Sequence, residues 1–73
     1  MNRLEVVQDE IILNDQEITI LKYLCEGLSN KEIAEKLHRS SRTVEKKRPQ
    51  IFFKTNTNNI AELVRFALRN KII

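Results

Sequence analysis

A helix-capping signal recurs along this chain, and it constrains the fold more than any other feature of the sequence. A polar residue that can cap a helix is followed three positions later by a glutamate at Asn14–Glu17, Ser29–Glu32 and Asn59–Glu62. In this capping box the two side chains bond to free backbone amides at the start of a helix. The sequence therefore predicts three helix starts, and Ser40 offers a fourth cap.

The residues between the caps predict where each helix runs. After Asn14, apolar residues follow at helical spacing until Gly27, which supplies a left-handed stop. Further helices are expected over 29–37, from 41 to about 54, and from 59 to about 70. The last of these helices is expected to direct inward Leu63, Val64, Ala67 and Leu68. Four capped helices with short connections predict an all-α fold.

Seventy-three residues suit one small domain. Residues 1–12 are weakly patterned and are expected to be an N-terminal segment or linker remnant, with short extended pieces as the alternative and poor order through Val7. Residues 13–73 are expected to form the helical domain.

Charge is divided unevenly along the chain. Residues 1–35 carry three basic and eight acidic side chains, a net charge of −5, whereas residues 36–73 carry ten basic and two acidic side chains, a net charge of +8. Such a division suggests that the second half meets a polyanion. The alternative is a solvated helical face that is basic without a function.

Several functional classes lack the residues that they need. Cys25 is the single cysteine and His38 the single histidine, so we expect no metal site, no cofactor and no catalytic constellation. One glycine excludes a phosphate-cradling loop. We also expect no small-molecule ligand in this domain. No apolar run is long enough to cross a membrane, and the start MNRLEVV lacks the features of a signal peptide, so a cytoplasmic location is expected.

Residues 29–44, SNKEIAEKLHRSSRTV, fit two short helices joined by a polar turn, which is the pattern of a helix-turn-helix. In the predicted third helix, Val44 and Ile51 are seven residues apart and should face the core. The opposite face is expected to carry Arg42, Glu45, Lys46 and Pro49, with Lys47 and Arg48 on its flanks.

The block GLSNKEIA followed by S-x-x-T-V resembles the LuxR/NarL-type DNA-binding domain, and the resemblance extends over residues 13–70. It implies a four-helix helix-turn-helix domain, related to winged helices but without a wing, in which the third helix is the recognition helix. It also implies a bacterial transcription regulator that binds specific double-stranded DNA, as a response-regulator output domain or a free-standing domain. A homodimer through the fourth helix and contact with RNA polymerase are further expectations.

The resemblance also assigns roles to residues. Those expected at phosphates are Ser29, Asn30, Lys31, Arg42, Thr43, Lys47 and Arg48; those expected to face base edges are Glu45, Lys46 and Pro49. The expected dimer surface comprises Ile60, Arg65, Phe66 and Arg69. For Ile60 and Phe66 the alternative is that they complete the core.

Some residues depart from the family pattern. Pro49 falls inside the recognition helix, where it removes a backbone hydrogen bond to the Glu45 carbonyl, so a kink, or else a break with a restart at Pro49, is expected. Proline offers no hydrogen bond to a base, only apolar contact. Phe53 stands where a charged residue is usual and could be an exposed aromatic.

These departures leave a second function open. A domain with weakened base recognition could serve as a protein-interaction or dimerisation module, and Glu45 and Pro49 are the residues that motivate this alternative. Enzymatic activity has no such support in the sequence.

Overall fold

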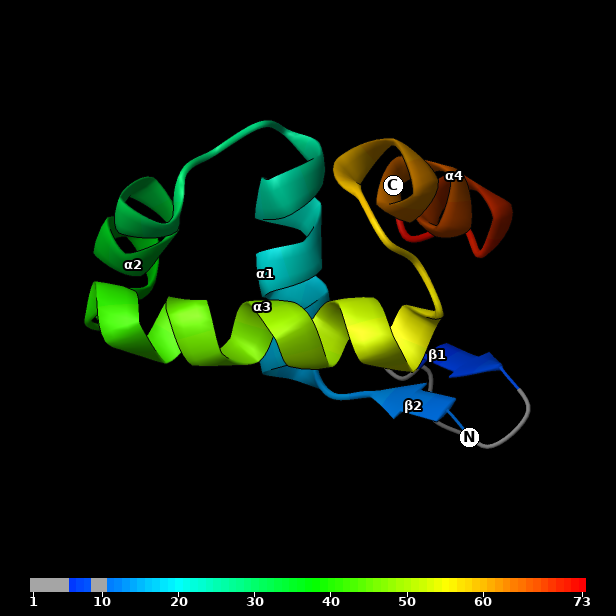
Figure 1. The fold of residues 1–73 in the computed structure, drawn as a ribbon, viewed down its shortest axis with the longest axis horizontal. Helices are drawn as coiled ribbons and strands as arrows, with labels where there is room; N and C mark the ends of the chain where they lie inside the picture. Colours follow the sequence, from blue (N-terminus) through cyan, green and yellow to red (C-terminus); the bar gives the residue numbers. More distant parts are fainter. Residues whose placement is uncertain (1–5, 9–10) are drawn as a thin grey trace.

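The computed structural model describes residues 6–8 and 11–73, with side chains from Leu13 onward. Four helices account for most of this part of the chain: α1 (Asp15–Cys25), α2 (Asn30–Leu37), α3 (Ser41–Thr55) and α4 (Ile60–Arg69). Figure 1 shows α3 running along one side of the molecule, with α1 crossing behind it, α2 beside its first half and α4 above its second half. The expected four-helix architecture is confirmed.

A small antiparallel hairpin precedes the helices. Strand β1 (Val6–Gln8) pairs with β2 (Ile11–Leu13), with Val6 opposite Leu13 and Gln8 opposite Ile11. The short extended pieces considered for the N-terminal segment are therefore present. Val6 and Val7 lie in β1, where poor order was expected; residues 1–5, to which the same expectation applied, lie outside the described residues.

The predicted caps are confirmed at atomic detail. The Glu17 amide donates to Asn14 Oδ1 at 2.8 Å, and Glu17 Oε1 accepts from the Asn14 amide at 3.0 Å. The box at Ser29 and Glu32 has matching distances of 3.1 and 2.8 Å. At α4 the box is incomplete, because the Glu62 carboxylate accepts from the Asn58 amide instead of the Asn59 amide.

A left-handed residue follows each of the four helices, with Lys71 after α4 at φ of 59°. Gly27 follows α1 with φ of 88°, as expected, while His38 ends α2 and Asn56 ends α3, each with φ of 56°. The turn at His38 is stabilised by a hydrogen bond from the Arg39 amide to the Ala34 carbonyl at 2.9 Å. These stops hold the connections short, so that each helix packs on its neighbour.

The core is apolar, and all four helices and the end of β2 contribute to it. Its buried members are Leu13, Ile20, Leu21, Leu24, Ile33, Ala34, Val44, Ile51, Leu63, Phe66 and Ala67. One inward prediction for α4 is wrong, since Leu68 is 58% exposed. Five residues separate it from Leu63, which turns its side chain about 140° around the helix from the buried face.

A buried carboxylate joins two helices. Glu17, at the first turn of α1, is 1% exposed, and Lys54, near the end of α3, donates to both of its carboxylate oxygens at 2.8 and 3.0 Å. Burial opposes ionisation of Glu17, but the bond from Lys54 and the bond from the Asn14 amide outweigh it, so the pKa of Glu17 is lowered. The sequence did not predict this contact.

Helix α3 continues through Pro49 without interruption. The expectation of a break is wrong, and the ribbon of α3 shows no visible bend in Figure 1. Pro49 and Glu45 are both exposed, so the Glu45 carbonyl that loses its backbone partner lies on the solvent side, where water can bond to it.

Among the described residues, no helix has the length and apolar character needed to span a bilayer.

Candidate nucleic-acid interface

Helices α2 and α3, joined by the turn at residues 38–40, form a helix-turn-helix. Ile33 and Ala34 are the buried residues of α2, and Val44 is the buried residue at the start of α3. With its inner residues covered, α3 leaves the other side of its first half free, and Figure 1 shows the β1–β2 hairpin beside its C-terminal end.

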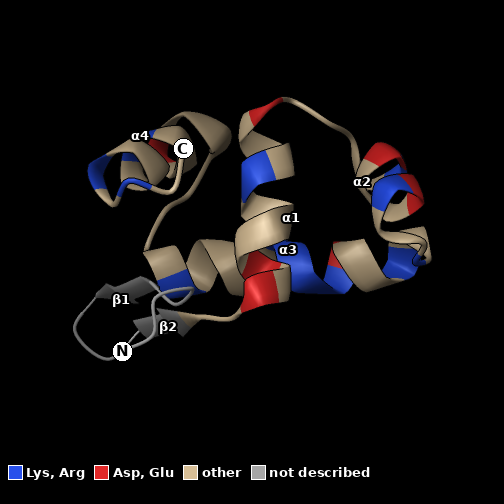
Figure 2. Ribbon diagram, turned by 180° about the vertical axis from the view of Figure 1, so that it is seen from behind, with Lys and Arg blue, Asp and Glu red and all other residues tan. Residues whose placement is uncertain are grey.

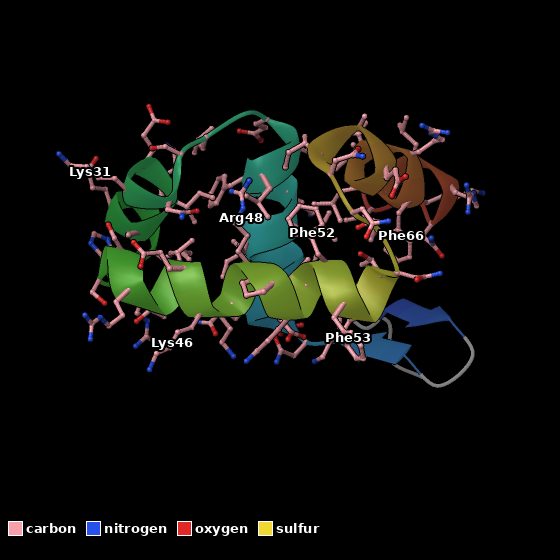
Figure 3. The ribbon with its side chains drawn as sticks, in the orientation of Figure 1. Lys31, Lys46, Arg48, Phe52, Phe53 and Phe66 are labelled. Atoms are coloured by element: carbon pink, nitrogen blue, oxygen red, sulfur yellow. The ribbon has the colours of Figure 1, made fainter. Side chains whose placement is uncertain are left out.

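The exposed residues of α3 define its outer face, which comprises Arg42, Glu45, Lys46, Pro49, Gln50 and Phe53. Spacings of four, three and four residues place Arg42, Lys46, Pro49 and Phe53 in one stripe. Figure 3 shows Lys46 and Phe53 directed away from α1 and α4, on the side opposite Phe52. All three base-facing residues of the sequence analysis therefore lie on the outer face of α3.

The N-terminus of α3 is suited to an anion. Ser40 caps the helix by accepting from the Thr43 amide at 3.3 Å, and its hydroxyl lies 3.2 Å from the Thr43 hydroxyl. The first turn has no acidic residue, and Arg42 is exposed there. A helix start carries partial positive charge, so this end can hold a phosphate.

Lys47 is half-buried on the flank of α3 that faces the start of α1. Its charge contributes to the lowered pKa of Glu17, which places the two groups within electrostatic range. Figure 2 shows this proximity as the acidic first turn of α1 beside the basic residues of α3. Lys47 therefore sits at the edge of the outer face, where its long side chain can extend toward solvent.

Arg48 does not lie with the other cations. It follows Val44 by one turn and precedes Ile51 by one turn, and both of these residues are fully buried. Its Nη1 donates to Asn30 Oδ1 at 3.3 Å, and its guanidinium carbon is 5.7 Å from the centre of the Phe52 ring. In Figure 3 it occupies the space between α2 and α1, away from Lys46.

The residues at the start of α2 that were expected at phosphates do not lie on the outer face of α3. The Ser29 hydroxyl is used in the capping box, and Asn30 is engaged by Arg48. Lys31 is exposed, and Figure 3 shows it extending from the side of α2 turned away from α3. These residues and the outer face of α3 therefore form two separate groups.

The expected dimer surface is divided by the structure. Arg65 and Arg69 are exposed and Ile60 is half-buried, but Phe66 is 6% exposed and belongs to the core. The sequence analysis gave a place in the core as the alternative for Phe66, and this alternative is observed. Leu68 is the exposed large apolar residue of α4 instead.

Fold and surface together define a helix-turn-helix DNA-binding domain. The chain matches the GerE family, described as “Bacterial regulatory proteins, luxR family”, over residues 12–67. It therefore belongs to the luxR family of bacterial regulatory proteins, as the resemblance implied. No solved structure matches the chain significantly.

Curated relatives agree with the family. The chain is 44% identical over 62 residues to the “Fimbriae Z protein” of Escherichia coli K12, covering 85% of this chain and 30% of that protein. It is 45% identical over 64 residues to the “Probable transcriptional regulator ycf29” of Cyanophora paradoxa, covering 88% and 30%. It is 44% identical over 62 residues to the “Oxygen regulatory protein NreC” of Staphylococcus carnosus, covering 85% and 29%. The chain thus spans about 30% of the length of these relatives.

Proposed function

We propose that this chain is the sequence-specific DNA-binding domain of a bacterial transcription regulator, and that the outer face of α3 enters the major groove. The observation that carries the proposal is the exposure of Arg42 and Lys46 on a helix whose other side is buried. Basic side chains on one exposed helix face match the phosphate backbone and the base edges of duplex DNA.

The roles follow from position. Lys46 reaches a base acceptor such as guanine O6, Glu45 accepts from a cytosine amino group, and Pro49 makes apolar contact. Arg42, Thr43 and Lys47 surround the start and flank of α3 and bind phosphates. Lys31 and the other residues at the start of α2 contact the DNA backbone only if the duplex also reaches the far side of α2. We therefore propose that they contribute less to phosphate binding than the residues of α3 do.

The wider assignments rest on the relatives. Because the chain is similar to named regulators, such as the “Oxygen regulatory protein NreC”, we infer that it acts as the DNA-binding output domain of a regulator, such as a response regulator. Residues 13–73 form the DNA-binding domain, and residues 1–12 form the segment that leads into it. We further propose that the chain forms a homodimer on paired half-sites and that it contacts RNA polymerase. The dimer surface would comprise Ile60, Arg65 and Arg69.

A salt series tests DNA binding. Affinity for a duplex, measured by fluorescence anisotropy, should fall steeply as salt rises, because each phosphate contact releases counterions and contributes about −0.9 to the slope of log K against log salt. Sedimentation with and without the duplex should show dimers on DNA. A flat salt dependence would contradict the proposal.

The protein-interaction alternative depends on weakened base recognition at Glu45 and Pro49. With α3 continuous, the outer face keeps its register through Pro49. A Pro49→Ala chain distinguishes the two functions. A gain of base preference in this variant would support the protein-interaction alternative, because it would show that Pro49 weakens base recognition. Unchanged, strong DNA binding would count against that alternative.

Arg48 is expected to act in stability rather than in phosphate binding. Replacing it by Met keeps an apolar stem but removes the bond to Asn30 and the contact with Phe52, so we expect a loss of about 1 kcal/mol in the free energy of unfolding. The salt slope of DNA binding should not change.

Lys47→Met is the matched comparison for Arg48→Met. Because we propose that Lys47 binds a DNA phosphate, replacing this lysine should reduce the steepness of the salt slope by about one. Thermal unfolding and a salt series on both variants separate the roles. An equal loss of slope in Arg48→Met would show that Arg48 does contact DNA.

A further inference from the structure

Phe53 is the most exposed large apolar residue among the described side chains. It is 84% exposed, whereas Phe66 is buried and Phe52 packs against the core. Figure 3 shows Phe53 and Phe52 leaving α3 on opposite sides. The core therefore does not account for the aromatic ring at position 53.

The surroundings of Phe53 indicate what covers it. It continues the stripe that carries Arg42 and Lys46, and Pro49 lies one turn before it. This stripe of α3 is thus cationic in its first half and apolar in its second half. Because the same face carries exposed cations, a polyanion that also offers apolar groups matches it better than an apolar protein surface does.

We propose that Phe53 contacts the 5-methyl group of a thymine in the major groove and thereby contributes to sequence preference. The inference rests on the proposed DNA-binding function and adds a specific contact to it. The thymine methyl is the apolar group that the major groove presents, and aromatic side chains are among those that contact it. Proline and phenylalanine together offer this group an apolar surface one helical turn long.

Helix geometry also locates the thymine. Seven residues separate Lys46 from Phe53, which corresponds to about 10 Å along the axis of α3. Successive base pairs are about 3.4 Å apart, so a helix lying along the groove places Phe53 about three base pairs from the base that Lys46 contacts. The thymine is therefore located relative to the base that Lys46 contacts, which is the position at which a Lys46→Ala chain should lose its base preference.

The test uses thymine and deoxyuridine, which differ by the methyl group alone. A duplex is first selected with the wild-type chain from a library with a random core of about 20 base pairs, enough for two half-sites one turn apart. Each thymine is then replaced singly by deoxyuridine. At one position per half-site, about three base pairs from the Lys46 contact, wild-type affinity should fall about fourfold, as expected for loss of one buried methyl group.

Variants at position 53 complete the cycle. Phe53→Ala should weaken binding to the thymine duplex about fourfold or more, and the deoxyuridine at that position should cause no further loss. Phe53→Leu should keep part of the thymine preference. Because Phe53 is exposed, the melting temperature of both variants should match that of the wild-type chain.

The outcomes that overturn the inference are distinct from failure of DNA binding. If Phe53→Ala binds like the wild-type chain, or loses affinity equally for thymine and deoxyuridine duplexes, Phe53 does not contact a thymine methyl, and a protein partner would then be the occupant to seek. If instead the wild-type chain shows no salt-dependent binding, the proposed function itself fails.

Discussion

The Lys54→Met chain is expected to melt about 8–16 °C below the wild-type chain, which corresponds to a loss of about 2 kcal/mol for a domain of this size. Methionine keeps the apolar stem but removes the ammonium group that bonds both Glu17 oxygens. A carboxylate that is 1% exposed is then left without its cation. Breaking a fully buried pair costs about 3–5 kcal/mol; because Lys54 is 37% exposed, a smaller loss of about 2 kcal/mol is expected here.

The pH dependence gives this prediction a second readout. In the wild-type chain the pKa of Glu17 is lowered, so its contribution to stability is fully present above the unfolded pKa of about 4.3 and is lost as pH falls through the folded pKa. Without Lys54, two of the causes that lower the pKa of Glu17 are removed, so its pKa should rise above the wild-type value. The stability difference between the two chains should therefore shrink as pH falls from about 5 to 3.

A matched control separates the ion pair from general loss of charge. Lys22 is exposed on α1, and Lys22→Met should change the free energy of unfolding by no more than about 0.5 kcal/mol. Thermal and urea unfolding followed by circular dichroism measure all three chains. A Lys54→Met chain as stable as the wild-type chain at neutral pH would show that the Lys54–Glu17 contact makes no net contribution.

Removing the exposed cations of α3 is expected to have the largest effect on DNA binding. Arg42→Ala should weaken binding to all duplexes by a similar factor and reduce the steepness of the salt slope by about one, because a phosphate contact carries no sequence information. Lys46→Ala should lose about 1–3 kcal/mol on the selected duplex and relax preference at one base position. Competition binding with single-base variants of the duplex measures both effects.

The control for these variants is Lys22→Ala, which removes an exposed cation from α1 and leaves the outer face of α3 intact. Its salt slope and base preference should equal those of the wild-type chain. Both α3 residues are exposed, so the variants should fold normally. If Lys46→Ala instead weakened every duplex equally, Lys46 would be a phosphate contact rather than a base contact.

Local signals in the sequence predicted the helices well. The boxes at Asn14 and Ser29 and the stop at Gly27 act within a few residues, so they can be recognised without knowledge of the fold. Helical spacing likewise predicted that Val44 and Ile51 face inward and that Lys46 faces outward. The same spacing places Arg48 between the two buried residues, whereas the family resemblance assigned it to a phosphate.

Contacts between distant segments could not be predicted in this way. The bond from Lys54 to Glu17 spans 37 residues, and the bond from Arg48 to Asn30 spans 18. Nothing in a single sequence indicates that these groups meet. The same limit applies to Phe66 and Leu68, whose burial depends on how α4 is rotated against the rest of the core.

The sequence by itself determined the helix starts and stops, the family and the cationic character of the third helix, because capping, periodicity and charge are local properties of the chain. Tertiary structure alone decided which cations are available to a partner. It engages Arg48 and Lys54 within the molecule and leaves Arg42 and Lys46 exposed beside Phe53, because burying an unpaired charge is costly, whereas an exposed charge retains its hydration.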